Sequence, residues 1–323
     1  MTSQPAPEEI MNEILEKLKN LGPKELLSYA IFDEEDEAKF YAELAEKVER
    51  PSVKALFKKM SEESKVHEML LRREFEKLFP GEEPVKVEAP PVEVYPFLPK
   101  FESAQDYLTA LRYCMESELF AKRTYEQLAL ISENDEVQKL AMELAEIEMG
   151  HYEEIKTVYE LIEEFERRNL TPEGLSPGAY LLTDEKKGKY FLLDFIDESK
   201  KLKLFVRENP LKFRRFLGDN VDIVWITKVR GPNTVTPEEL PTMRVDIEDF
   251  FVSARSEGKR GALFIQNLGY LLTQMGFQKL MDLVLYIKDV AVLNEGYLIA
   301  TALPDVFEKR EWAIVESEFD VIS

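Results

Sequence analysis

Two glutamate-rich segments carry the residues of this chain that could bind a metal ion. His151 follows Glu148 at a spacing of three residues, which places a carboxylate and an imidazole on one face of a helix. His67, the only other histidine, has Ser64 at the corresponding position. Carboxylates and imidazoles together are typical ligands of iron and manganese in helical proteins. The segment around His151 therefore predicts half of a metal site. The segment around His67 predicts the other half with one carboxylate missing.

The two histidines belong to an internal repeat with an offset of 84 residues. The same offset relates glutamates, tyrosines and apolar residues: Glu34 with Glu118, Tyr41 with Tyr125, Leu27 with Leu111, Leu44 with Leu128, Ala45 with Ala129 and Glu62 with Glu146. An offset that is shared by chemically different residue types indicates a duplicated unit. We interpret this unit as a helical hairpin that occurs twice.

Helical hydrophobic periodicity predicts the elements that carry these residues. A short amphipathic helix over residues 7–20 ends before Gly22 and Pro23, and four long helical patterns follow. They cover residues 24–49, 51–79, 102–131 and 134–168. The segment PGEEPVKVEAPPVEVYPFLPK separates the second pattern from the third, and its prolines forbid a helix there. Four helices with one long crossover after the second predict a ferritin-like bundle.

The metal-ligand candidates lie in the middle of apolar stripes on these predicted helices. In the last helix, Glu148 and His151 interrupt a stripe of leucine and isoleucine residues. Burying such polar groups is costly unless a partner satisfies them. Dinuclear carboxylate bundles take one glutamate from each of two helices and Glu-x-x-His from each of the other two. Glu34 and Glu118 fit the first role, whereas the second role is complete only around His151.

Ser64 leaves this arrangement one carboxylate short, and two nearby residues are alternatives for the missing group. Glu63 precedes His67 by four residues, and Glu37 follows Glu34 by three residues on the same stripe. We favour Glu37, because it shares the inward face of its helix. The predicted metal ligands are Glu34, Glu37, His67, Glu118, Glu148 and His151. A degenerate bundle that holds one metal or none is the alternative, since Ser64 is a change that decay of the site would produce.

Two tyrosines and the single cysteine accompany the predicted ligands. Tyr41 and Tyr125 each follow a predicted glutamate ligand by seven residues. We predict a catalytic role for both as hydrogen-bond donors to the carboxylates, with simple packing as the open alternative. Cys114 lies one turn before Glu118 and is interpreted as a small core residue. A single cysteine excludes an internal disulfide and a cysteine-rich iron centre.

Three segments resemble the helices of rubrerythrin-like ferritin proteins: AIFDEEDEAKFYAELAEKV, CMESELFAKRTYEQLAL and LAEIEMGH. The resemblance covers about residues 24–168. It implies a carboxylate-bridged dinuclear centre of iron or manganese that reduces peroxide or oxygen or oxidises ferrous iron. Rubrerythrins proper also carry an iron that is held by four cysteines, which this chain lacks. The resemblance therefore implies an external electron donor such as a rubredoxin.

The pattern changes after residue 178, where short apolar runs alternate with helical segments. The runs AYLLT, KLFV, DIVWIT, ALFIQ and YLIATAL are nearly continuous in apolar residues, as strands buried on both faces are. They predict a mostly parallel, doubly wound α/β domain. Residues 178–318 resemble an archaeal α/β domain of unknown function, in which Asp-Gly tends to stand where this chain has Gln266 and Asn267. We interpret the domain as an interaction or regulatory module, because it has no glycine-rich phosphate loop.

Composition limits the partners that we expect. A net charge of −21 counts against binding to nucleic acid or to an anionic membrane surface. No run of 18 apolar residues and no basic-then-apolar N-terminal pattern is present, so we expect a cytoplasmic protein. The predicted domains are a lead helix over residues 1–23, a bundle over 24–169, a linker over 170–178 and an α/β domain over 179–323.

The leading hypothesis for function is peroxide or oxygen reduction at a dinuclear metal site, with the α/β domain in a regulatory role. The first alternative is a metal or redox sensor, or an adaptor, in which the metal state of the bundle controls what the α/β domain binds. The second alternative is a structural role, in which the bundle serves dimerisation. We expect a homodimer in each case.

Overall fold

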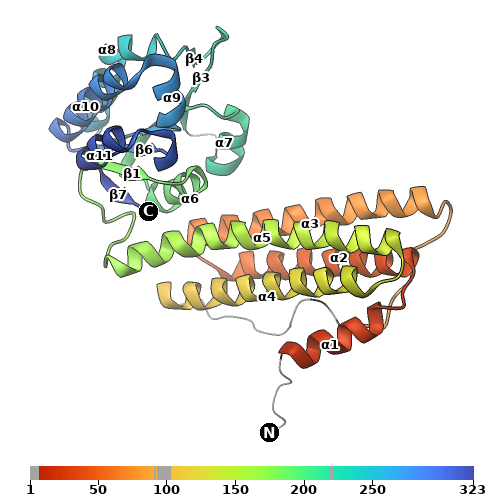
Figure 1. The fold of residues 1–323 in the computed structure, drawn as a ribbon. Coiled ribbons are helices and arrows are strands. Elements are labelled where there is room, and N and C mark those ends of the chain that lie inside the picture. Colours follow the sequence, from red (N-terminus) through yellow and green to blue (C-terminus); the bar gives the residue numbers. More distant parts are fainter. Residues whose placement is uncertain (1–6, 91, 93–102, 219–220) are drawn as a thin grey trace. The chain divides into compact units, whose positions relative to one another are not determined.

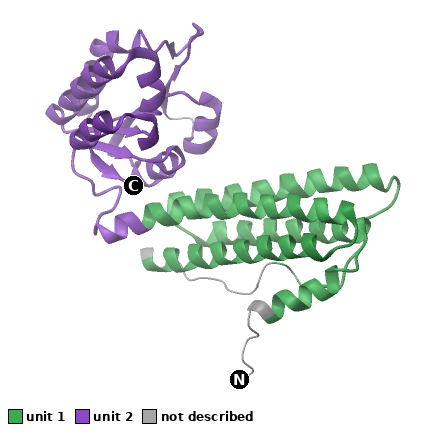
Figure 2. Ribbon diagram, in the orientation of Figure 1, with its two compact units in different colours: residues 1–162 green, residues 163–323 purple. Residues whose placement is uncertain are grey.

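A computed structural model describes residues 7–90, 92, 103–218 and 221–323 of the chain. The fold divides into two compact units, residues 1–162 and residues 163–323 (Figure 2). The division falls near the end of the last bundle helix, and the predicted linker over residues 170–178 lies in the second unit. No helix among the described residues has the length and apolar character needed to cross a membrane.

The first unit consists of helices, as the periodicity predicts (Figure 1). They are α1 (Pro7–Leu18), α2 (Pro23–Lys47), α3 (Pro51–Leu78), α4 (Ala104–Ile131) and α5 (Asp135–Arg167). Helices α2 to α5 lie side by side in a four-helix bundle, and α1 packs near α4. Pro23 and Pro51 occupy the first turns of α2 and α3, where a missing backbone N–H costs nothing. Ser103 caps α4 by accepting a hydrogen bond from the backbone N–H of Asp106.

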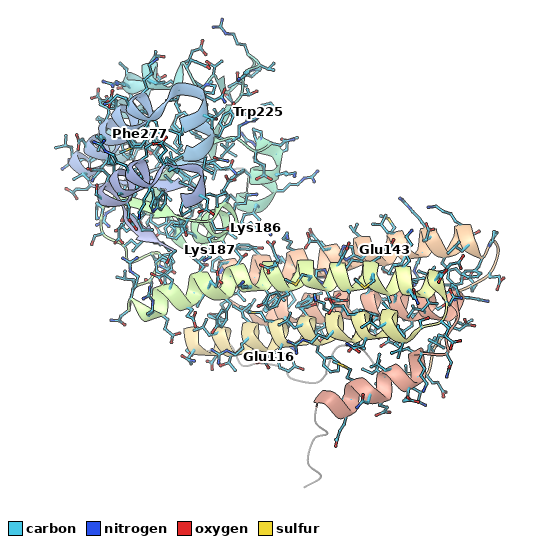
Figure 3. All side chains as sticks on the ribbon, in the orientation of Figure 1. Glu116, Glu143, Lys186, Lys187, Trp225 and Phe277 are labelled. Atoms are coloured by element: carbon cyan, nitrogen blue, oxygen red, sulfur yellow. The ribbon has the colours of Figure 1, made fainter. Side chains whose placement is uncertain are left out.

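Helical periodicity separates the inner and outer faces of the bundle. Glu116 on α4 and Glu143 on α5 are exposed, and Figure 3 shows both side chains pointing away from the bundle. Glu118, two residues after Glu116, is completely buried. Residues two apart on a helix point in different directions, so the same residue type serves opposite roles on one helix. Most glutamates therefore lie on the surface in contact with solvent, and a few lie in the core.

The connection from α3 to α4 follows α2 for part of its length. Residues 79–90 and Val92 contain no helix, as the prolines predict. The backbone N–H of Val85 donates to Ser28 Oγ at 3.1 Å, and Tyr29 Oη donates to the carbonyl of Pro90 at 2.8 Å. Val92 is completely buried. The remainder of the predicted crossover, at residues 91 and 93–102, lies outside the described residues.

The second unit contains a seven-stranded parallel sheet with the strand order β4-β3-β2-β5-β6-β1-β7. Its strands are β1 (Gly178–Leu182), β2 (Lys200–Val206), β3 (Asp222–Ile226), β4 (Thr234–Val235), β5 (Arg260–Ile265), β6 (Tyr297–Thr301) and β7 (Asp320–Ile322). The five predicted strands are present. The two edge strands β4 and β7 were not predicted, because two or three residues show no periodicity.

Helices cover both faces of this sheet, as expected for a doubly wound fold. They are α6 (Glu185–Phe195), α7 (Pro210–Leu217), α8 (Arg244–Ser256), α9 (Leu268–Met275), α10 (Phe277–Leu293) and α11 (Lys309–Glu318), with short 3₁₀ turns at η1 (Leu240–Thr242) and η2 (Pro304–Val306). On one face, Phe195 of α6 packs on Tyr297 and Phe213 of α7 packs on Phe264. On the other face, buried residues of α8, α10 and α11 form one core with the sheet.

Candidate metal centre

Four predicted ligands from three helices meet in the core of the bundle. Glu37 of α2, Glu118 of α4, and Glu148 and His151 of α5 each place one ligand atom within 4.8 Å of the others. Nδ1 of His151 lies 3.2 Å from Glu37, 3.7 Å from Glu118 and 3.9 Å from Glu148. All four side chains are buried. Three carboxylates around one imidazole form a group that could hold a metal ion.

The other two predicted ligands form a smaller group beside the first. Nδ1 of His67 on α3 lies 3.5 Å from Oε1 of Glu34 on α2. The ring centroids of His67 and His151 are 5.3 Å apart, with the ring planes inclined by 31°. The six predicted ligands therefore approach one region of the core. Their assignment as ligands stays a prediction.

The structure places the two alternatives for the missing carboxylate in different surroundings. Ser64 is completely buried, and its hydroxyl lies 3.1 Å from Oε2 of Glu37 and 2.9 Å from the carbonyl of Met60. Glu63 instead pairs with Lys59 at 3.1 Å, and 41% of its side chain is exposed. Glu37 thus faces the serine across the core, whereas Glu63 belongs to the surface.

Several buried polar atoms of this region lack partners. Among the described residues, no hydrogen bond of good geometry is made by either oxygen of Glu34, Oε2 of Glu118, Oε2 of Glu148, Nδ1 of His67 or either ring nitrogen of His151, although these groups lie 3.2–3.9 Å from one another. Buried polar groups in folded proteins are nearly always paired, and an unmade hydrogen bond costs about 1–3 kcal/mol, more for a charged group. So many unpaired atoms in one place indicate a partner that is not a protein group. A cation that binds oxygen and nitrogen ligands fits this description.

Burial and mutual repulsion perturb the ionisation of these residues. Burial, followed by the neighbouring Glu37, raises the pKa of Glu34 and of Glu148 well above the usual range of a glutamate. Burial lowers the pKa of His151, but the carboxylates of Glu37 and Glu118 outweigh this effect and raise it well above normal. Burial, together with the charge of His151, lowers the pKa of His67. A bound cation would offset the repulsion between these neighbouring carboxylates.

The two predicted catalytic tyrosines make different contacts. Tyr41 Oη donates a hydrogen bond to Oε1 of Glu118, one of the carboxylates predicted to be a ligand. Tyr125 Oη instead donates to Oδ2 of Asp33 at 3.2 Å. Burial and repulsion from Glu37 raise the pKa of Asp33 to about 7. The catalytic roles of Tyr41 and Tyr125 stay predictions.

Asp33 is an acidic neighbour of the site that the sequence analysis missed. The repeat provides no signal for it, because the residue 84 positions later is Ser117. Cys114, interpreted from the sequence as a core residue, is buried and takes no part in the four-residue group.

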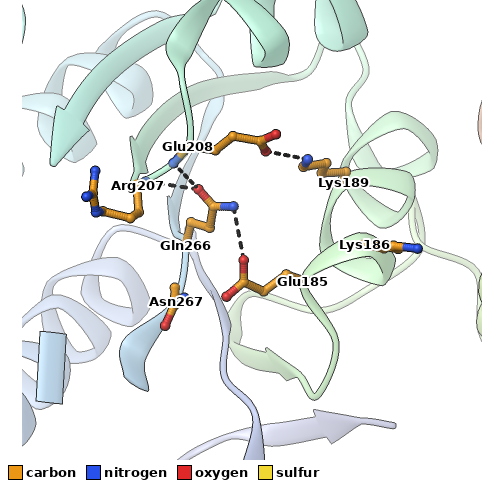
Figure 4. Close-up of a pocket in the computed structure, with 7 residues that line it drawn as sticks. All are labelled: Glu185, Lys186, Lys189, Arg207, Glu208, Gln266 and Asn267. Carbon is orange, nitrogen blue, oxygen red and sulfur yellow. Dashed lines mark hydrogen bonds and ion pairs between the residues drawn. The ribbon is translucent and has the colours of Figure 1, made fainter. Parts of the chain in front are cut away.

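The α/β unit has a pocket of its own at the carboxyl ends of β2 and β5 (Figure 4). Its volume is about 320 Å³, and its lining residues are Glu185, Lys186, Lys189, Arg207, Glu208, Gln266 and Asn267. The chain leaves β2 toward β3 on one side and leaves β5 toward β6 on the other. This divergence is the topological switch point, where ligands of open α/β sheets commonly bind.

Gln266, at the floor of this pocket, is 3% exposed and is bonded at both ends of its amide. Its Oε1 accepts hydrogen bonds from the backbone N–H groups of Arg207 and Glu208 at 2.9 and 3.0 Å. Its Nε2 donates to Glu185 at 3.3 Å, as Figure 4 shows. Lys189 forms an ion pair with Glu208. Gln266 thus links β5 to the turn after β2 and to α6, which is a structural role.

Comparisons with known proteins agree with this division into two parts. Residues 25–159 match the family model described as Rubrerythrin. Residues 181–319 match the model described as Protein of unknown function (DUF835). A solved structure, "Hypothetical Protein Pfu-1136390-001" from Pyrococcus furiosus, shares 32% identity across 47% of this chain and 96% of that chain, with a TM-score of 0.39. Among curated proteins, none matches this chain. The chain therefore joins a segment that matches the Rubrerythrin model to a segment that matches the DUF835 model.

Proposed function

We propose that the rubrerythrin-family domain of this chain binds a dinuclear iron or manganese centre and reduces peroxide or oxygen there. The observation that carries the proposal is the set of buried carboxylate and imidazole atoms without hydrogen-bond partners in the described part of the bundle. The family model that matches residues 25–159 supports it independently. Bound cations would satisfy these atoms and relieve the repulsion between neighbouring carboxylates.

The residues of the chain suit this chemistry. The metals would be held by Glu34, Glu37, His67, Glu118, Glu148 and His151. When bound, a pair of redox-active metal ions supplies the two electrons that convert one hydrogen peroxide and two protons into two water molecules. Tyr41 donates a hydrogen bond to Glu118, which orients that carboxylate and places a proton donor beside the site. The bundle core excludes bulk water from Glu118 and His151.

The returning electrons must come from outside the chain in this proposal. Cys114 is the only cysteine, so no iron held by four cysteines can form within the chain. An external donor such as a rubredoxin fills this role. We also propose a homodimer in the cytoplasm, which size measurements on the purified chain and its cellular distribution test.

Metal analysis followed by an activity assay tests the proposal. The full chain, loaded anaerobically with ferrous iron, should retain metal, and it should consume peroxide faster than the same iron in buffer when a reduced rubredoxin is supplied. His151→Ala should lose most of the metal, because it removes a ligand and leaves three carboxylates facing one another. Wild-type protein as poor in metal as this variant would refute the proposal.

A metal or redox sensor is the second candidate, and one observation favours it. Ser64 stands where the repeat has Glu148, so the site departs from the regular arrangement of its own second half. An attached DUF835 domain provides a separate module through which a metal state could act. Retention of metal without any peroxide or oxygen turnover, in the assay described above, would favour this candidate over the enzyme.

A further inference from the structure

The two histidines of the candidate metal centre have unequal surroundings. Three carboxylates lie between 3.2 and 3.9 Å from Nδ1 of His151. Among the described residues, one carboxylate, that of Glu34, lies at a comparable distance from Nδ1 of His67. A metal position next to His151 would therefore have three carboxylates and an imidazole, whereas one next to His67 would have half as many ligands.

Exposure follows the same division. The side chain of His67 is 24% exposed, whereas that of His151 is 3% exposed. Val66 and Leu70, on the same turns of α3, are 49% and 51% exposed. The His67 end of the centre thus lies near the protein surface, and the His151 end is enclosed by the core. The ring of His67 is therefore partly accessible to solvent, whereas its Nδ1 and both oxygens of Glu34 are buried.

The difference has a local origin in Ser64 and Glu37. A glutamate at position 64 would add a carboxylate one turn before His67, as Glu148 does before His151. Glu37 occupies the space beside the serine, but its other oxygen lies 3.2 Å from His151. Glu37 therefore adds a carboxylate beside His151, and the position beside His67 still lacks the carboxylate that Ser64 does not supply.

We propose that the two metal positions are unequal in affinity and exchange. This inference depends on the proposed metal centre. The enclosed position, formed by Glu37, Glu118, Glu148 and His151, retains its divalent cation. The open position, formed by Glu34 and His67, binds a second divalent cation loosely and exchanges it with solvent. Two glutamates fewer at the open end, together with the partial exposure of the His67 ring, account for the difference.

Cobalt binding to the metal-free full chain tests the proposal without any need for activity. Titration with Co²⁺, followed by visible absorbance and equilibrium dialysis, should show two steps whose affinities differ by about 100-fold or more. About one Co²⁺ per chain should remain after passage through a desalting column. A chelator should remove the second ion rapidly and the retained one slowly.

A matched pair of histidine variants assigns the two steps. His67→Ala should remove the weak step and keep the retained ion, with its affinity changed less than about threefold. His151→Ala should abolish retention, with an affinity loss of about 100-fold or more. Should an alanine variant fail to fold, as judged by circular dichroism, His67→Gln and His151→Gln replace the pair.

The outcomes separate failure of this inference from failure of the proposed function. Two Co²⁺ ions bound with equal affinity would overturn the inequality while leaving a dinuclear centre intact. Equal losses in the two histidine variants would overturn it as well. No Co²⁺ binding at micromolar protein would refute the metal centre itself, and the inequality with it.

Discussion

The bundle and the α/β domain differ in how far their buried polar side chains are hydrogen-bonded. In the bundle, several oxygens and nitrogens of Glu34, Glu118, Glu148 and His151 have no hydrogen-bond partner among the described residues. In the α/β domain, Gln266 is equally buried, but three partners satisfy its amide. An unsatisfied buried group is costly, so a bound cation would stabilise the bundle, whereas Gln266 already contributes to stability.

This contrast separates a candidate site from a candidate scaffold. Position alone would favour the α/β pocket, because it lies at the switch point of a parallel sheet. Its most buried polar residue, Gln266, however, forms hydrogen bonds that connect elements of the fold. The candidate metal centre of the bundle is less conspicuous, but its buried polar atoms are the ones without hydrogen-bond partners among the described residues.

Replacing a buried glutamate should affect metal binding far more than replacing an exposed one on the same helix. Glu118→Gln should lower metal affinity by about 100-fold, because a neutral amide is a poor substitute for a carboxylate ligand. Glu116→Gln, two residues away and exposed, is the matched control and should bind metal as the wild type does. Isothermal titration of both variants with Co²⁺ measures the difference. Equal affinities would show that Glu118 is not a ligand.

Gln266→Ala should destabilise the α/β domain and leave the metal centre unchanged. The substitution removes three hydrogen bonds and leaves two backbone N–H groups without their acceptor, at a cost of about 2–3 kcal/mol. Gln278→Ala, at an exposed position of α10, is the control. Chemical denaturation, followed by tryptophan fluorescence of Trp225 and Trp312, measures the loss. A Gln266→Ala variant that is as stable as the control would contradict the structural role.

Metal affinity should fall as the pH is lowered, beginning above the usual titration range of a glutamate. The pKa values of Glu34 and Glu148 are raised by burial, so protons compete for these carboxylates at a pH where ordinary glutamates are already ionised. Each proton released on binding changes the affinity about tenfold per pH unit. Co²⁺ titration between acidic and slightly alkaline pH tests this slope. An affinity independent of pH would indicate ligands that are already ionised.

The same shifts determine the pH dependence of the metal-free bundle. A glutamate whose folded pKa exceeds its unfolded pKa favours folding while it is protonated, and this contribution is lost as the pH rises through the folded pKa. Glu34 and Glu148 should therefore make the metal-free bundle less stable as the pH rises. Glu148→Gln should reduce that loss, and bound metal should oppose it. Thermal unfolding of both proteins with and without metal measures these differences.

The relation between Ser64 and Glu37 should appear as a modest coupling. Glu37→Ala should weaken metal binding, and Ser64→Glu alone should be poorly tolerated because it adds a carboxylate to a crowded core. The double variant should recover part of the affinity, with a coupling free energy of about 1 kcal/mol. Additive effects of the two substitutions would mean that Glu37 does not replace the carboxylate missing at position 64.

The sequence alone determined the long helices and the correspondence between the two repeated helical hairpins. Long helices follow from apolar spacing over many turns, and the offset of 84 residues relates His67 to His151 before any coordinates are known. The five buried strands were also predicted, and in the structure they are five to seven residues long. These features are local or repeated, so they leave a periodic signal in the chain. The edge strands β4 and β7 are too short to leave one.

Only the tertiary structure decided which side chains meet. Glu37 and Glu63 were both acceptable by spacing, but Lys59 holds Glu63 at the surface while Glu37 faces Ser64 in the core. Tyr125 pairs with Asp33, which has no counterpart in the repeat. The unequal burial of the two histidines could likewise not be predicted from the sequence, since both lie on similar apolar stripes of their helices. Periodicity gives the direction of a side chain, and its partner depends on what the neighbouring helices bring to the same place.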